Sequence, residues 1–114
     1  MRDDRGRLLD ILEAIENINR RAAADRDDFI GDEMLHVWVI HHIQIIGEAA
    51  SNLSPQLRDR YPAVPWADII SMRNILVHQY FGVDPVQVWD TVAEDLPKLG
   101  KEIETVLREL EEKT

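Results

Sequence analysis

Cysteine is absent from this chain of 114 residues. Its absence excludes disulfide frameworks, thiolate metal sites and cysteine nucleophiles. A chain without cysteine suits a reducing compartment, and we expect a cytoplasmic protein. Long hydrophobic runs are lacking too: the longest stretch without a charged side chain lies between Glu33 and Glu48 and is too short to span a bilayer. The opening residues, MRDDRGRLLD, are charged and no long apolar run follows, so no signal peptide is predicted.

Basic residues are in the minority, 13 Lys and Arg against 22 Asp and Glu, which gives a net charge of −9. Such a global field disfavours nucleic-acid binding. Residues 82–114 hold nine acidic and four basic side chains, net −5, whereas residues 29–81 hold five and three, net −2, with all four histidines. Any anion site is therefore expected to be local and to lie in the middle of the chain.

Strand-like alternation, internal repeats and low-complexity segments are also missing from the pattern. Hydrophobic residues make up 45% of the chain and charged residues 31%, which are ordinary globular values. At this length there is room for one core, so we expect a single domain at residues 1–114. The predicted fold class is all-α, an up-and-down bundle of four or five helices.

The first two helices are predicted at residues 3–24 and 31–53. The first has apolar residues at helical spacing, namely Leu8, Ile11, Leu12, Ile15, Ile18 and Ala22. The run ADRDD that follows it is predicted to be a loop. The second is apolar nearly all round, which indicates that more than one of its sides is covered. In so small a domain another subunit can supply the second cover, so we expect a homodimer.

Serine and proline predict where two shorter helices begin. Ser54 is expected to cap a short helix with Pro55 in its first turn, and this helix stops before Pro62. Pro65 is expected to open the helix after it.

The last helix is predicted at residues 85–112, with Asp84 as its cap and Pro85 in its first turn. Pro97 lies inside this helix and removes one backbone donor, so we expect a kink near residues 93–97. The tail RELEEKT is expected to be a solvated, fraying end.

The apolar segment WADIISMRNILVHQYFG, residues 66–82, contains four polar side chains that need a reason: Arg73, Asn74, His78 and Tyr80. On a regular helix the stripe that faces the core consists of Ile69, Met72 and Leu76. Arg73 and Tyr80 lie at or beside this stripe. His78 lies about 180° away from it, with Asn74 as its neighbour one turn earlier.

Arg73 is the residue hardest to explain, because a guanidinium stays charged and its partial burial requires a partner or a bound anion. One interpretation is an internal ion pair with Glu48 of the second helix. The other is that Arg73 presents its guanidinium to a phosphate, with Glu48 or Asn74 orienting it. His78 can equally be a packed side chain or a catalyst, and Tyr80 a core aromatic. The spacing alone is a weak signal.

MRNILVHQYFG resembles the signature of the HEPN superfamily, which consists of an arginine, a polar residue, and a histidine five positions after the arginine. The tyrosine two residues after the histidine resembles the HepT branch. The likeness extends along the chain, through RDDRGRLLDILEAIENI, IIGEAASNLSPQLRDRYPAVPW and YFGVDPVQVWDTVAEDLPKL.

This resemblance implies a homodimeric α-helical ribonuclease, the toxin of a type VII toxin–antitoxin system of the HepT/MntA kind. It implies RNA as substrate, no metal or other cofactor, and a partner nucleotidyltransferase. By position, Arg73 and His78 would be the catalytic pair, contributed by both subunits, with Asn74 in support. Tyr80 matches the tyrosine that the partner modifies with AMP, which silences the toxin.

Two other hypotheses stay open. In the first, the chain is a non-catalytic helical subunit that binds a nucleotidyltransferase, and Arg73 and His78 are structural. In the second, it is a metal enzyme built on His36, His41 and His42. The spacing of these histidines fits neither the paired i, i+4 arrangement of a helical zinc site nor a carboxylate-rich site.

Overall fold

Helices form nearly all of the secondary structure in the computed structural model, which describes residues 3–22, 25–71 and 84–112. In chain order these are α1 (Asp4–Ala22), α2 (Arg26–Ile30), α3 (Glu33–Ser51), α4 (Pro55–Arg60), a helical segment at residues 66–71, α6 (Pro85–Asp90), the π-helical segment η2 (Thr91–Asp95) and α7 (Leu96–Glu112). The described ranges contain no strand. The predicted all-α class is therefore confirmed.

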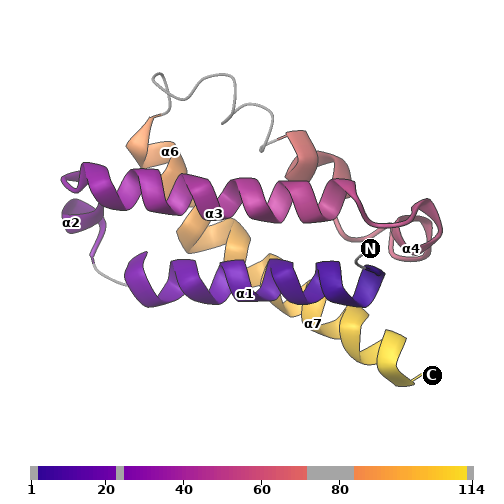
Figure 1. Cartoon of the computed structure of the whole chain (residues 1–114). Helices are drawn as coiled ribbons and strands as arrows, with labels where there is room; N and C mark the ends of the chain where they lie inside the picture. The colour runs from indigo at the N-terminus through magenta and orange to yellow at the C-terminus, as the bar shows by residue number, and fades with distance from the viewer. Residues whose placement is uncertain (1–2, 23–24, 72–83, 113–114) are drawn as a thin grey trace.

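The core lies where α1, α3 and α7 meet. Figure 1 shows α1 and α3 side by side and running in opposite directions, and α7 packs against α1. The apolar stripe predicted for α1 faces the core. Its members Leu8, Ile11, Ile15, Ile18 and Ala22 are buried, and Leu12 is partly buried. Each such side chain contributes roughly 1.5–3 kcal/mol when it leaves water. The largest side chains that are almost completely buried are Leu8, Ile11, Ile18, Phe29, Val39, Ile43, Ile46, Leu96, Ile103 and Val106.

The loop predicted for the run ADRDD is wrong in part, because α2 begins inside it. The Asp25 carboxylate accepts the backbone N–H groups of Asp27 and Asp28, at 2.8 and 3.1 Å. Asp27 and Asp28 then lie in the first turn, where the helix dipole favours negative charge. Phe29 is fully buried and anchors this short helix to the core. The charges that suggested a break are thus a cap and a first turn.

The apolar helix predicted at residues 31–53 is α3, and Asp32 caps it by accepting the N–H of Leu35 at 3.1 Å. One side of α3 packs into the core. On the opposite side two apolar side chains are exposed, Met34 at 81% and Val37 at 48%. Among the helices that the structure describes, none is both long and apolar enough to pass through a membrane.

The predicted cap at Ser54 is confirmed and also ties α4 to α1. Ser54 Oγ accepts the N–H of Leu57 at 3.2 Å, and Pro55 is the first residue of α4. The N–H and hydroxyl of Ser54 both donate to the Asp4 carboxylate, at 2.9 and 2.7 Å. One carboxylate therefore fixes the start of α4 against the start of α1.

The last predicted helix is continuous but irregular at the expected place. Asp84 caps it by accepting the N–H of Val86 at 2.9 Å, and Pro85 occupies the first turn. The π-helical η2 separates α6 from α7 immediately before Pro97. Proline has no N–H and its ring crowds the carbonyl four residues earlier, and a wider turn at this point relieves both problems.

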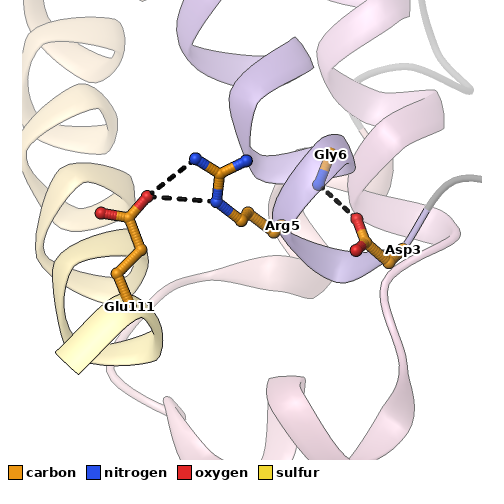
Figure 2. A network of polar contacts seen from close by, with 4 residues as sticks. All are labelled: Asp3, Arg5, Gly6 and Glu111. Carbon is orange, nitrogen blue, oxygen red and sulfur yellow. Dashed lines mark hydrogen bonds and ion pairs between the residues drawn. The ribbon is translucent and has the colours of Figure 1, made fainter. Parts of the chain in front are cut away.

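The tail RELEEKT, expected to fray, is helical as far as Glu112 and is tied to the first helix by an ion pair. Arg5 Nε donates to Glu111 Oε1 at 3.2 Å, and a terminal guanidinium nitrogen lies 3.1 Å from the same oxygen. Figure 2 shows this pair beside the Asp3 carboxylate, which accepts the N–H of Gly6. The Arg5 and Glu111 side chains are about half exposed, at 55% and 48%, so the pair contributes little to stability.

Candidate functional site

Four of the predicted site residues, Arg73, Asn74, His78 and Tyr80, lie outside the described residues. The fifth, Glu48, lies within them on α3. The structure therefore describes the part of the chain just before the motif, namely the helical segment 66–71 and the residues that it contacts.

The segment 66–71 is held at its start by a short loop. Trp66 Nε1 donates to the carbonyl oxygen of Tyr61 at 3.0 Å, and the N–H of Val64 bonds to the same carbonyl at 3.1 Å. Val64, Trp66 and Ile69 are buried. Ile69 faces the core as the predicted stripe requires. Because its first turn is fixed in this way, the helix that leads into the motif has a defined starting position.

Glu48 is exposed, whereas an internal ion pair would call for a buried carboxylate. Its carboxylate accepts from Asn52 Nδ2 at 3.2 Å, and its carbonyl oxygen accepts from the same nitrogen at 2.9 Å. It lines a groove between α1 and α3, of about 330 Å³, together with Arg7, Asp10 and His41. An ion pair made by an exposed carboxylate is screened by water and contributes little to stability.

Two of the histidines of α3 are used structurally. His36 Nε2 donates to the carbonyl oxygen of Phe29 at 2.6 Å, and the two rings lie 5.0 Å apart. His42 is buried, and its Nδ1 donates to the carbonyl oxygen of Trp38 at 2.8 Å. His41 is exposed. Within the described ranges, no three histidine, aspartate or glutamate side chains come together in a way that could hold a metal ion.

Tyr61 is the one described residue whose pKa clearly departs from its ordinary value of 10.0, and the shift is upward. Burial is the largest cause, followed by a hydrogen bond to Glu109 and the charge of that carboxylate. Tyr61 therefore remains a neutral phenol well above neutral pH.

Arg58 is a residue that the sequence analysis did not single out. It lies in the last turn of α4, and its Nε is buried without a hydrogen-bond partner. It lines a groove with Trp66, Ile70 and Ser71 of the segment that leads into the motif. The one sign of it in the sequence is that this basic residue comes just before the loop that positions segment 66–71.

The described elements define an all-α bundle. Comparison with known proteins gives its family. The family model described as ribonuclease HepT-like matches residues 11–106. This range is most of the chain, so the chain belongs to the HepT-like ribonuclease family. The resemblance drawn from the motif is thereby confirmed.

Two relatives illustrate the similarity. The chain is 41% identical over 106 residues to "Putative RNase MJ1380" of Methanocaldococcus jannaschii, covering 92% of this chain and 97% of the relative. It is 40% identical over 98 residues to "Probable ribonuclease HepT" of Thermococcus cleftensis, covering 85% and 89%. A comparison with solved structures finds no match.

Proposed function

We propose that this protein is a metal-independent endoribonuclease, the toxin of a HepT/MntA-type toxin–antitoxin system. Membership of the HepT-like ribonuclease family supports the ribonuclease activity. The observation that carries the proposal is the motif itself, Arg73 and Asn74 followed by His78 and Tyr80, which lies within the matched range.

Cleavage without metal uses the 2′-hydroxyl of the RNA as the nucleophile, so the protein supplies only proton transfer and charge stabilisation. An imidazole with an ordinary pKa near 6.5 transfers protons efficiently near neutral pH, which is the role proposed for His78. Arg73 holds the scissile phosphate and stabilises its growing negative charge by two-point contact. Asn74 and Glu48 bind substrate or orient Arg73.

A composite site shared by two copies of the chain explains how Arg73 and His78 can act on one phosphate. On one regular helix Arg73 and His78 point about 140° apart and close poorly around a single phosphate. Two copies related by a two-fold axis close better. The exposed apolar side chains of α3, Met34 and Val37, favour the outer face of this helix as the surface that the second copy covers.

Control by a partner follows from Tyr80. A nucleotidyltransferase that adds AMP to its hydroxyl places a bulky anionic group two residues along the chain from His78. This group competes with RNA for Arg73 and fills the cleft.

Removal of divalent metal tests the proposed chemistry. We expect the purified protein to cleave single-stranded RNA at an unchanged rate in excess EDTA, because no step uses a metal ion. The new 5′ ends are expected to carry a hydroxyl, since the 2′-oxygen displaces the 5′-oxygen. Gel analysis with and without polynucleotide kinase labelling measures both. Cleavage that stops in EDTA and returns with added magnesium would overturn the metal-independent mechanism.

Modification by the partner tests the assignment of Tyr80. With ATP, magnesium and the cognate transferase, we expect intact-mass spectrometry to show the wild-type chain gaining the mass of AMP, whereas Tyr80→Phe gains none. Tyr80→Phe is also expected to stay toxic when the partner is present. Tyr61→Phe is the control, because Tyr61 lies outside the motif and should not affect modification. AMP found on another residue, with Tyr80 unmodified, would refute the assignment.

A second candidate function is a non-catalytic subunit that binds a nucleotidyltransferase, and the net charge of −9 favours it because an acidic surface suits a basic partner face. Purified protein separates the two functions. A correctly folded dimer that degrades no RNA, yet forms a stable complex with the transferase, would support the binding subunit.

A further inference from the structure

Arg58 stands out among the described residues because its charged side chain has no hydrogen bond or ion pair there. Its side chain is half-buried at the end of α4, and its Nε is shielded from water without a hydrogen-bond partner. Among the described residues its guanidinium also has no ion-pair partner. A guanidinium cannot lose its charge, and a buried donor without a partner destabilises the fold. The terminal nitrogens of this unpaired guanidinium are therefore the groups available to a ligand with oxygen acceptors.

The groove beside Arg58 has the size and the walls of a binding site. Its volume is about 470 Å³, within the roughly 300–1,000 Å³ typical of ligand sites. One wall belongs to α4 and the other to the helical segment that leads into the motif. The residues that line it are Pro55, Arg58, Asp59, Trp66, Ala67, Ile70 and Ser71. Ser71, at one end of this lining, stands two residues before Arg73 in the sequence.

The balance of charge separates this groove from three others on the described surface. Acidic residues outnumber basic ones in the α1–α3 groove, in the groove between residues 65–69 and α7, and in the groove around α2. Beside α4, Arg58 faces a single acid, Asp59, with which it forms no ion pair. In a chain of net charge −9, this groove is the one of the four that best accepts an anion.

We propose that the Arg58 groove binds a backbone phosphate of the RNA, one that flanks the phosphate to be cleaved. The terminal nitrogens of the planar guanidinium, which are not buried as Nε is, present two donors to two phosphate oxygens. The apolar wall of Ile70 accommodates the neighbouring sugar. A strand held here lies against segment 66–71, which precedes the proposed catalytic residues in the chain. This subsite rests on the proposed ribonuclease function, whose substrate it positions.

The test is binding of an uncleavable RNA, a single-stranded oligonucleotide with 2′-O-methyl groups throughout, followed by fluorescence anisotropy. Arg58→Ala is expected to raise Kd about five- to tenfold at low salt, and to reduce the salt slope of log Kd by about 0.7, the loss of one phosphate contact. The matched control is Arg60→Ala, which removes the same charge from the same helical turn at an exposed position outside the groove. It is expected to change Kd less than twofold (~1.5-fold).

Two further variants keep the test independent of folding. Arg58→Lys retains the charge but not the planar fork, and is expected to recover only part of the affinity. Asp59→Asn removes the acid of the groove and is expected to tighten binding about two- to threefold, a gain that a damaged fold cannot produce. With cleavable RNA, Arg58→Ala should raise KM and leave kcat unchanged, because the contact is the same in the ground and transition states.

Equal Kd values for Arg58→Ala and Arg60→Ala would overturn the subsite. So would unchanged RNA binding by Arg58→Ala together with lost binding of the transferase, since the groove would then be a protein contact. Wild-type protein that binds RNA through Arg58 but never cleaves it would instead refute the proposed nuclease function and leave the subsite standing. The two failures are therefore distinguishable.

Discussion

Replacing Arg73 or His78 with alanine is expected to slow RNA cleavage by about a hundredfold to ten-thousandfold. His78→Ala removes the proton-transfer group, and Arg73→Ala removes the charge that stabilises the phosphate in the transition state. Both effects should fall mainly on kcat. Initial rates on a fluorescent single-stranded RNA measure the loss, with circular dichroism and light scattering to show that fold and assembly are retained.

The chain supplies matched controls for both variants. His41→Ala removes another imidazole that is exposed, and Arg60→Ala removes another exposed guanidinium. Each control is expected to keep near-wild-type kcat. If all four variants cleave RNA as fast as the wild type, Arg73 and His78 are not catalytic. Mixed dimers of Arg73→Ala and His78→Ala add a sharper result: they recover one intact site only if a site takes Arg73 from one copy and His78 from the other.

The second large effect is expected from Val37→Glu on the outer face of α3. Val37 is 48% exposed in the single chain, so a glutamate there should leave the fold intact. In the proposed dimer the same carboxylate would be buried against a second copy without a partner, which strongly disfavours association. We expect a monomer by analytical ultracentrifugation and cleavage reduced by more than about tenfold, because the composite site is lost.

Thr105→Glu is the control for this substitution. It introduces the same charge at another exposed β-branched position, on α7. It should leave the dimer and its activity unchanged. A Val37→Glu protein that remains dimeric and active would show that the second copy does not cover this face, without bearing on the roles of Arg73 and His78.

Local chemistry made much of the fold predictable. Ser54, Asp84 and the prolines after them fix helix starts through single hydrogen bonds, and the structure has those starts where predicted. The disturbance before Pro97 follows from a missing donor, although its form, a π-helical segment, depends on how neighbouring turns repack. The missed start of α2 shows the limit of charge as a signal. The same aspartates occur in loops and in caps, and burial of Phe29 decides between the two.

The candidate site was less predictable, because it depends on which side chains the tertiary structure brings together. Glu48 was identified by type as the acid inside an apolar helix, but its exposure depends on how α3 sits against α1. Arg58 gave no signal as an isolated arginine. Arg58 becomes a candidate only in the structure, because its guanidinium is unpaired there and because segment 66–71 lies across the groove. The motif at residues 73–80 could be recognised only as a resemblance.

The contacts Asp4–Ser54 and Arg5–Glu111 place both described ends of the chain at the α4 end of the bundle, as Figure 1 also shows. An affinity tag fused to either end would emerge on that side, close to the helix that carries Arg58. A polyhistidine tag would add imidazoles and positive charge beside a groove whose anion binding is in question. Proteolytic removal of the tag before RNA titrations keeps that added charge out of the measured affinity.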